Sequence, residues 1–494
     1  LAEIEVHKQT DGKVPHIIQR AMIFKRFQET RTLHIYEDEL IIGNVNSKIR
    51  GSLIFGYLLG NQLDAELDDP VYDYEIRSND RHHIPEEERE IIRKEIVPFF
   101  KGHCMEDDMY ARADGDVKDK AFTNGLCPHL PNMADVMTRA DAGHALSNYE
   151  KVLQIGLNGI KKEIEFYRNQ NKASYNHFYK KKKADFYDAC MISMEGAEIL
   201  CHRYSELAYE MAEKETDEKR KAELKEIGRI SAKVPMNPAE TWQEALQSVW
   251  MTQVLILGEQ MNYADSFGRF DQYMYPYYKK SVEENKEITR EQALELLECF
   301  FVKTAEWTQL YDYNSASVQV AFPITQNLLI GGQTKEGTDA CNEVTMLCLE
   351  AEEQVGLIQP EIAMRIWKGT PTKYLRKAAE VVRLGRGKPK FYGDSKAIQM
   401  MHHAYPDMSL EDLRDYAVIG CVEISMPHIT QQHSASGIFN IGKILDLTLH
   451  NGKCSICGTQ LGPETGDPRN FKTMDEFLEA YRKQNDYFMD ILCR

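Results

Sequence analysis

Residues 415–427 read Asp-Tyr-Ala-Val-Ile-Gly-Cys-Val-Glu-Ile-Ser-Met-Pro, which is the most informative stretch of the sequence. The apolar run from Tyr416 to Gly420 predicts a short buried strand that leads directly into Cys421. Alternate side chains of an extended segment share one face, so we expect Glu423 on the same face as Cys421. The stretch therefore predicts a strand that presents a thiol and a carboxylate together.

Three interpretations of this pair are open from the residues alone. In the first, Cys421 is a small buried residue at a strand end and Glu423 is solvated, because cysteine is often buried. In the second, Cys421 is a nucleophilic thiolate, which needs a base, and His428 and His433 are close in the sequence. In the third, Cys421 carries a radical and Glu423 is its acid–base partner. The local spacing alone favours the first interpretation.

Long helical patterns alternate with short apolar segments over the rest of the chain. Helical spacing of apolar residues predicts helices within 148–233, 290–307 and 336–353, and Asn-Pro-Ala-Glu at 237–240 predicts another helix start. Short apolar runs bounded by turn residues at 328–330 and 361–367 predict buried strands. This alternation predicts an α/β fold, with a barrel as the favoured architecture. No break divides the chain, so we expect one large domain over 1–494.

Bulk composition excludes several classes of protein. The 494 residues are 43% hydrophobic and 28% charged, which argues against disorder, and a net charge of −17 disfavours a nucleic-acid partner. The basic run 180–183 lies among helix-forming residues and predicts a solvated helix face. No apolar stretch is long enough to span a membrane, and no secretory signal is recognisable. Eleven cysteines without a disulfide rhythm indicate a reducing cytoplasm.

Cys454-Ser-Ile-Cys457 is a separate motif with its own alternatives. Such a pair is half of a zinc site or a redox pair, but zinc needs two further ligands. No second pair has suitable spacing, so we interpret these cysteines as incidental thiols and predict no metal. No phosphate-binding loop or dinucleotide fingerprint is present.

Gly420-Cys421-Val422-Glu423 resembles the Gly-Cys-Val-Glu motif of the glycyl radical enzymes. The similar branch contains glycerol, propanediol and hydroxyproline dehydratases, choline lyase and arylacetate decarboxylases. Three further segments resemble this family in the same order along the chain, at 143–153, 266–277 and 385–394. The resemblance spans nearly the whole chain. It implies the N-terminal and central part of the family's ten-stranded β/α barrel, surrounded by many helices.

The resemblance also implies a chemistry. In this family a radical is stored on a backbone glycine and passed to the cysteine sulfur, which abstracts hydrogen from the substrate. Cys421 is then the hydrogen abstractor and Glu423 the base, in a lyase that eliminates water or another group from a small polar metabolite. A thiyl radical needs a dry, closed cavity. The resemblance further implies no bound cofactor, an iron–sulfur radical S-adenosylmethionine activating enzyme as partner, a homodimer and a cytoplasmic location.

The resemblance suggests further pocket residues. His144 matches a substrate-contacting histidine, and Asp265 matches an aspartate that binds a substrate amine. Ser266 and Thr325 are expected in the same pocket, although many relatives have an aromatic residue where Thr325 stands. Arg139 is a candidate anchor for a carboxylate or sulfonate. The structural alternatives are an interhelical hydrogen bond for His144, a turn cap for Asp265 and a surface salt bridge for Arg139.

Three departures from the family pattern bear on which reaction of the family this chain would carry out. Gly420 stands where formate acetyltransferases carry a second cysteine, which disfavours acyl transfer from pyruvate. His-Ser-Ala-Ser at 433–436 replaces an acid of the diol dehydratases. The Arg-Val-x-Gly-Tyr type motif that carries the radical is missing from these residues, so we expect a fragment, a split gene or an incompletely covered protein. The alternatives are an arylacetate-type decarboxylase, a catalytically inactive scaffold and a hydrolytic Cys–His enzyme.

Overall fold

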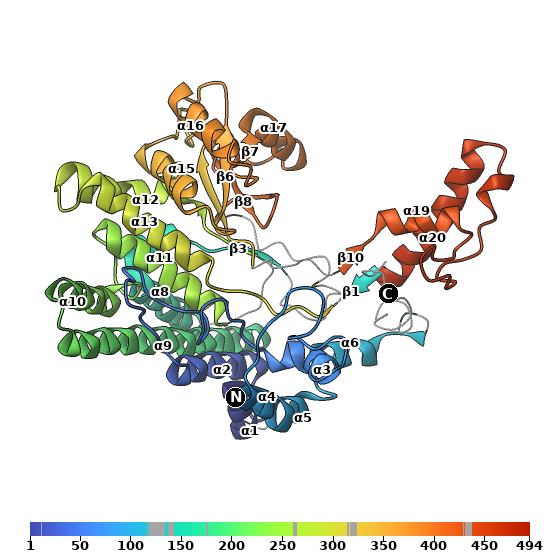
Figure 1. Cartoon of the computed structure of the whole chain (residues 1–494), viewed down its shortest axis with the longest axis horizontal. Helices are drawn as coiled ribbons and strands as arrows, with labels where there is room; N and C mark the ends of the chain where they lie inside the picture. The colour runs from blue at the N-terminus through green and yellow to red at the C-terminus, as the bar shows by residue number, and fades with distance from the viewer. Residues whose placement is uncertain are drawn as a thin grey trace. The chain divides into compact units, whose positions relative to one another are not determined.

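The computed structural model describes residues 1–10, 12–115, 117, 134–136, 143–173, 176–259, 264–313, 316, 324–427, 429 and 437–494 (Figure 1). The chain forms two compact units. Unit 1 comprises residues 1–53, 143–309 and 323–433, and unit 2 comprises residues 54–142, 310–322 and 434–494. Each unit is assembled from three separate segments, which explains why no single break in composition marks a boundary.

Unit 1 is built around parallel strands. The strands are β2 (His144–Leu146), β3 (Ala264–Ser266), β4 (Gly268–Arg269), β5 (Asn327–Gly331), β6 (Glu361–Ile366) and β7 (Lys390–Gly393). β2 pairs in parallel with β3, and β4 to β7 pair in parallel in chain order. The backbone N–H of Asp265 donates to the Thr325 carbonyl at 3.1 Å, which links β3 to the start of β5. The parallel strands β2 to β7 therefore lie side by side in the order in which they occur in the sequence. The α/β prediction is confirmed.

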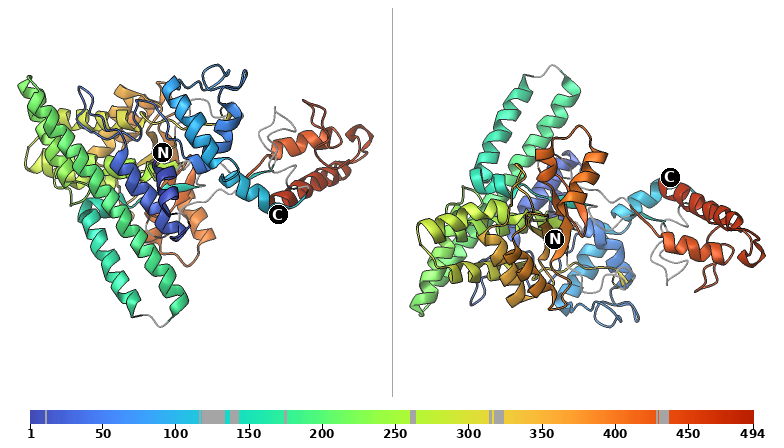
Figure 2. Two further views of the ribbon diagram at one scale, coloured as in Figure 1. Left: turned by 90° about the horizontal axis from the view of Figure 1, so that it is seen from below. Right: turned by 90° about the horizontal axis from the view of Figure 1, so that it is seen from above.

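Helices cover these strands. They are α1 (Ala2–Thr10), α2 (His16–Thr30), α8 (Tyr149–Lys172), α9 (His177–Lys214), α10 (Glu218–Lys233), α11 (Trp242–Leu257), α12 (Phe270–Tyr278), α13 (Arg290–Thr304), α15 (Glu343–Val355), α16 (Thr372–Val382), α17 (Asp394–Ala404) and α18 (Leu410–Arg414). The predicted long helices between 148 and 233 are confirmed as α8, α9 and α10. Helix α9 packs against α2, α8 and α10, and its long pairing with α8 is visible in both views of Figure 2.

Two predicted helix starts are wrong. The helix expected from residue 237 begins at Trp242, and the helix expected from 336 begins at Glu343. Residues 235–239 pair instead with a kink of α8 at Gly156, where the Ala239 N–H donates to the Leu153 carbonyl at 3.0 Å. A Cβ on Gly156 would lie 2.5 Å from the Met236 carbonyl oxygen, so this close approach requires glycine.

A buried ion pair holds the strand that carries Cys421. Arg365 on β6 donates to both carboxylate oxygens of Asp394, at 2.8 and 3.0 Å, and to the Tyr416 carbonyl at 3.0 Å. The Tyr416 hydroxyl donates to the same carboxylate at 2.8 Å, and the Arg365 guanidinium lies 3.9 Å from the centre of the Tyr416 ring. All three side chains are fully buried. The network therefore fixes residue 416, which immediately precedes the Cys421 hairpin.

We predict that Arg365→Met destabilises unit 1 by about 3–5 kcal/mol, because the variant leaves a buried carboxylate without its cation. Denaturant unfolding followed by tryptophan fluorescence measures this change, since all four tryptophans of the chain lie in unit 1. Arg376→Met, which removes an exposed arginine of α16, is the control and is expected within about 0.5 kcal/mol of the parent. Equal stability of the two variants would contradict the anchoring role of Arg365.

Unit 2 contains α3 (Gly56–Glu66), α4 (Glu86–Ile91), α5 (Val97–Phe100), α6 (Met105–Arg112), α19 (Ile441–Leu449) and α20 (Met474–Cys493). Strands β1 (Ala134–Val136) and β10 (Gly437–Phe439) pair in antiparallel fashion. Helices α19 and α20 share an apolar core that includes Ile444, Leu447 and Phe488. Helix α19 therefore buries an apolar face just before the segment that carries Cys454.

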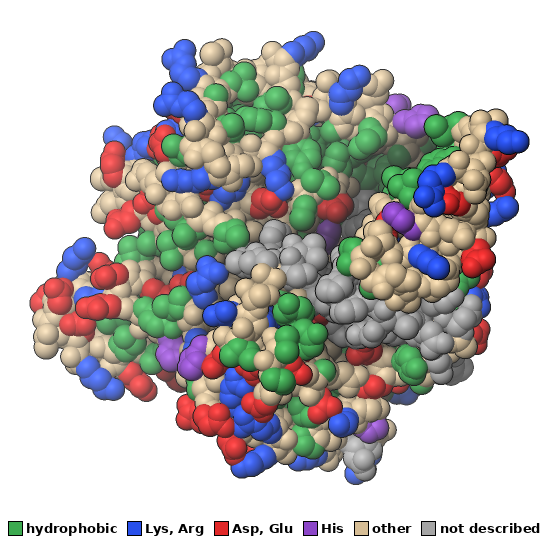
Figure 3. Space-filling view, turned by 45° about the vertical axis from the view of Figure 1, so that its right-hand side comes forward, with side chains coloured by type: hydrophobic (Ala, Val, Ile, Leu, Met, Phe, Trp, Pro, Cys, Tyr) green, Lys and Arg blue, Asp and Glu red, His purple; other side chains and the backbone are tan. Residues whose placement is uncertain are grey.

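The distribution of charged and apolar residues agrees with the expectations from composition. On the face drawn in Figure 3, basic and acidic side chains are interspersed. The run 180–183 lies on α9, where residues 181–183 are exposed, as predicted. Within the described ranges, no helix is long and apolar enough to cross a bilayer. No disulfide joins the cysteines in the part of the chain that the structure describes.

Candidate active site

Cys421 lies in the tip of a short hairpin. Strands β8 (Ala417–Ile419) and β9 (Glu423–Ser425) pair in antiparallel fashion, with Ile419 opposite Glu423. The predicted strand before the cysteine is confirmed. The expectation that Cys421 and Glu423 share one extended face is wrong, because residues 420–422 form the turn and Glu423 starts the returning strand.

Polar groups of the parallel strands surround Cys421. The Thr325 hydroxyl lies 3.6 Å from the Cys421 sulfur, at the start of β5. The Cys421 carbonyl accepts hydrogen bonds from the Lys390 ammonium at 3.4 Å and the Tyr392 hydroxyl at 3.3 Å, both on β7. The cysteine is half-buried, whereas Val422 beside it is 61% exposed. The backbone of the turn is thus held on one side while the thiol lies next to Thr325.

The Glu423 carboxylate faces a histidine. Its Oε2 lies 3.2 Å from His144 Nδ1, with 29% of the glutamate side chain and 16% of the histidine side chain exposed. The same oxygen accepts the backbone N–H of Val422 at 3.2 Å. His144 is the first residue of β2, so the strand wall positions the histidine against the hairpin. The carboxylate is therefore partly shielded and directed at an acid–base side chain.

Gly420 permits this arrangement. Its φ of 58° lies in the left-handed region, and its N–H donates to the hydroxyl of buried Ser266 at 3.1 Å. A Cβ at this position would lie 2.3 Å from His144 Nδ1 and 2.5 Å from Glu423 Oε2. Any larger residue would therefore push apart the two groups that meet at the hairpin.

We predict that Gly420→Ala lowers turnover by about 100-fold, because a displacement of about 1 Å at a reacting group has an effect of that size. The left-handed backbone adds about 1–2 kcal/mol of strain. The measurement is kcat of the activated full-length protein, with a substrate identified by screening for release of water, sulfite or carbon dioxide. Gly385→Ala is the control for a glycine of positive φ, since a Cβ there meets no atom within 4 Å. Equal losses in the two variants would show that strain alone explains the effect.

The other predicted residues have mixed outcomes. Asp265 is buried in β3 immediately before Ser266, and its carbonyl accepts from the Gln253 side chain at 3.0 Å. Burial, with the nearby Asp265 charge, raises the pKa of Tyr149 well above its ordinary value. Arg139 and the two histidines at 428 and 433 lie outside the described residues. The structure therefore gathers Cys421, Glu423, His144, Ser266 and Thr325 around one hairpin, with Asp265 in the adjoining strand.

Lys390 and Tyr392 were not predicted as site residues. Lys390 forms an ion pair with Glu361 on β6. Burial raises the pKa of Tyr392 to about 12, with contributions from the Glu361 and Glu423 charges, so its hydroxyl stays protonated and donates. The sequence does indicate that these two side chains act together, because they are two residues apart in the strand Lys390–Gly393 and therefore share one face.

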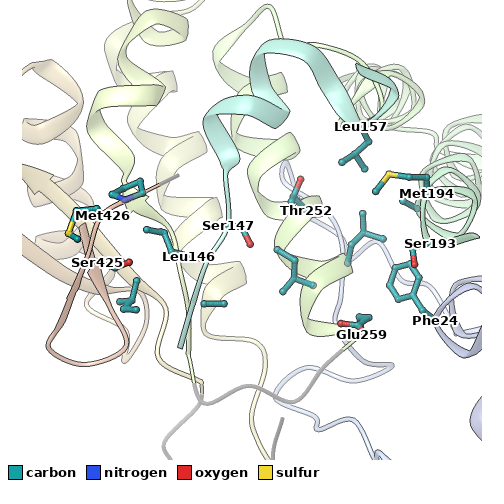
Figure 4. Close-up of a pocket in the computed structure, with 16 residues that line it drawn as sticks. Phe24, Leu146, Ser147, Leu157, Ser193, Met194, Thr252, Glu259, Ser425 and Met426 are labelled. Atoms are coloured by element: carbon teal, nitrogen blue, oxygen red, sulfur yellow. The ribbon is translucent and has the colours of Figure 1, made fainter. Parts of the chain in front are cut away.

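A cavity of about 470 Å³ lies beside the hairpin base (Figure 4). Its lining combines Ile419, Ser425 and Met426 with side chains of α2, α8, α9 and α11, including Met194 and Thr252. Neither Cys421 nor Glu423 lines it. The cavity therefore does not include the contact between Glu423 and His144 or the Cys421 thiol.

Comparison with known proteins identifies the family. The family model described as pyruvate formate lyase-like matches residues 1–494. The chain is 32% identical to the isethionate sulfite-lyase of Oleidesulfovibrio alaskensis, over 98% of this chain and 58% of that protein. It is also 32% identical to the trans-4-hydroxy-L-proline dehydratase of Clostridioides difficile, over 99% of this chain and 60% of that protein.

A solved structure agrees with these matches. The glycerol-bound B12-independent glycerol dehydratase from Clostridium butyricum superposes with a TM-score of 0.89 at 34% identity, over 99% of this chain and 60% of that one. The chain thus spans 58–60% of the length of the relatives it matches. The likeness confirms the predicted barrel type of fold. The chain belongs to the pyruvate formate lyase-like family of glycyl radical enzymes.

Proposed function

We propose that this chain is the catalytic-cysteine part of a radical lyase that eliminates water or another small group from a small polar metabolite. The observation that carries the proposal is the turn at Cys421, with Glu423 held 3.2 Å from His144. The names of the relatives, a sulfite-lyase and a hydroxyproline dehydratase, both describe eliminations. Since the chain covers only part of these relatives, its activity is inferred for the whole protein.

The residues of the hairpin have separate roles in this proposal. A glycyl radical, when supplied, generates the sulfur radical on Cys421 by taking its hydrogen atom. The Cys421 sulfur then removes a hydrogen atom from a substrate carbon, and Glu423 accepts the proton of the hydroxyl on that carbon. The neighbouring group leaves, and the sulfur returns its hydrogen to the product radical. His144 holds the carboxylate in place and provides a route for its proton.

The remaining polar groups bind and orient. We assign Thr325 and Ser266 to the substrate pocket because both contact the Cys421 turn, at 3.6 and 3.1 Å. Asp265 is a candidate for a cationic group of the substrate, and Arg139 remains a sequence prediction for an anionic one. Lys390 and Tyr392 bind the Cys421 carbonyl and fix the direction of the thiol.

The partners belong to the same proposal. We infer activation by an iron–sulfur radical S-adenosylmethionine enzyme, a homodimeric assembly and a cytoplasmic location, all of which follow from the family resemblance. An arylacetate-type decarboxylase is the second candidate, because it also carries a Cys-x-Glu arrangement. The paired His144 and Glu423 favour elimination, since this step requires a base beside the thiol.

The test uses the full-length gene product that contains these 494 residues. Anaerobic incubation with an activating enzyme is expected to give a glycyl radical signal in electron paramagnetic resonance. A substrate screen then follows release of water, sulfite or carbon dioxide from hydroxylated amino acids, sulfonates, diols and arylacetates. Carbon dioxide release alone would favour the decarboxylase. Failure to form the radical with any family activating enzyme would support an inactive scaffold.

A further inference from the structure

A second cysteine site lies in unit 2, directly after α19. After α19 the chain folds back on itself, with Lys453 and Gln460 forming an antiparallel bridge. The Cys454 N–H donates to the Thr459 carbonyl, and the Gly458 N–H donates to the Cys454 carbonyl, both at 2.9 Å. This closed loop contains both cysteines of the Cys-Ser-Ile-Cys motif and holds them in one turn.

Cys454 is surrounded by hydrogen-bond donors although it is only 2% exposed. Its sulfur lies 3.1 Å from the Lys443 ammonium and accepts the backbone N–H groups of Ile456 at 3.4 Å and Cys457 at 3.5 Å. Burial opposes ionisation, but these donors outweigh it and lower the pKa of the Cys454 thiol to about 6. Cys201 shows the opposite case, because burial in a helix raises the pKa of that thiol to about 12.

Lys443 is buried beside the Cys454 sulfur. Its side chain is only 5% exposed, and the ammonium pairs with Asp446 as well as contacting Cys454. Asp446 in turn accepts the Ser455 N–H at 3.3 Å and lies 3.1 Å from His450 Nδ1. A buried ammonium requires compensating negative charge. Asp446 supplies that charge, and the ammonium that it holds in place also donates to the Cys454 sulfur and favours the thiolate over the thiol.

Cys457 differs from its neighbour in one decisive respect: it is exposed to solvent. Its sulfur lies 3.3 Å from the Thr459 hydroxyl, and its thiol also hydrogen-bonds the Cys454 sulfur. An external disulfide reaches Cys457 first, and the buried thiolate already lies against it. The two sulfurs thus have the positions of an entry thiol and a resolving thiolate.

We propose that Cys454 and Cys457 form a thiol–disulfide exchange site that reacts with low-molecular-weight disulfides. The Cys457 thiol passes its proton to the Cys454 thiolate, and its sulfur attacks one sulfur of the external disulfide and forms a mixed disulfide; the displaced sulfur takes that proton and leaves as a thiol. Cys454 then attacks the Cys457 sulfur, forms the Cys454–Cys457 disulfide and releases the second thiol. Two protein thiols are oxidised and the external disulfide is reduced to two thiols. The proposal does not depend on the Cys421 chemistry.

A metal is the competing occupant of a Cys-x-x-Cys turn. Zinc requires four ligands, and two sulfurs supply only half of them. Among the residues that the structure describes, no group of three or more His, Cys, Asp or Glu side chains is placed to hold a metal. The Lys443 ammonium, moreover, lies next to the Cys454 sulfur, where a cation would compete with it.

The test exposes the purified chain to oxidised glutathione, alkylates the remaining thiols and maps the products by mass spectrometry. The wild-type chain is expected to give the intramolecular 454–457 disulfide. Cys454→Ser is expected to stop at a stable glutathione adduct on Cys457, while Cys457→Ser leaves Cys454 reduced because it is buried. Cys493→Ser, which removes another exposed cysteine of unit 2, is the control and leaves the disulfide unchanged.

Lys443→Met tests the thiolate. Removing the ammonium destabilises the Cys454 thiolate of the reduced pair, so the equilibrium with glutathione shifts toward the disulfide by about tenfold. Lys443→Arg keeps the charge and serves as the comparison if the methionine variant loses helicity. Wild-type chain that yields only adducts, or that binds stoichiometric zinc under reducing conditions, would overturn the proposal.

Discussion

Cys421→Ser is expected to abolish turnover while leaving the glycyl radical signal of the activated full-length protein intact. Serine lacks a weak S–H bond, so the radical has no sulfur to which it can transfer. Loss of a group that forms the reacting centre lowers rates by roughly 10⁴- to 10⁶-fold in enzymes with a comparable essential residue. The hairpin should persist, because the 3.3 and 3.4 Å hydrogen bonds at this position involve the backbone carbonyl rather than the sulfur.

The matched control is Cys190→Ser, which removes a half-buried cysteine of α9 and is expected to leave turnover unchanged. Electron paramagnetic resonance and product formation are measured on the same samples, so loss of activation is distinguished from loss of chemistry. Residual turnover in Cys421→Ser within tenfold of the parent would exclude a sulfur-centred reaction at this position.

Glu423→Gln separates hydrogen abstraction from elimination. The amide keeps nearly the same shape but cannot accept the substrate proton, and removal of a general base costs about 10²- to 10⁴-fold. Hydrogen abstraction by Cys421 does not require the carboxylate. A substrate that carries deuterium at the reacting carbon is therefore expected to exchange the deuterium for hydrogen from water in this variant, through the Cys421 thiol, while product formation falls.

Glu411→Gln, an exposed change on α18, is the control for the loss of one negative charge. If Glu423→Gln eliminates at the parental rate, the base lies elsewhere and the assignment fails. If both exchange and elimination stop, the carboxylate positions the turn rather than removing a proton.

The fold was predictable where the pattern is long and local. Helices α8, α9 and α10 follow from apolar spacing, and the strand before Cys421 follows from its apolar run. The start of α11 was missed because residues 235–239 bond to a kink in α8, a contact between segments distant in the sequence. The two compact units could not be predicted from the sequence either, because each unit consists of three segments that are separated along the chain.

The site was predictable as residues but not as geometry. Resemblance to the family drew attention to Cys421, Glu423 and His144. The turn between the first two, and the 3.2 Å approach of His144 to Glu423, depend on strands β2 and β9 meeting in space. Lys390 and Tyr392 were missed because their alternation indicates that they share a face but not what that face meets, and their partner is the backbone carbonyl of Cys421.

The interleaving of the two units has a consequence for biosynthesis. Unit 1 lacks its last segment until residue 433 has been made, and unit 2 until residue 494. At about 5–20 residues per second, the Cys421 hairpin emerges roughly tens of seconds after β2, because α8 to α18 and β3 to β7 lie between them in the sequence. Helices α8, α9 and α10 can pack on one another and on α2 once residue 233 has been made, whereas the contact between His144 and Glu423 must wait until most of the chain has been synthesised.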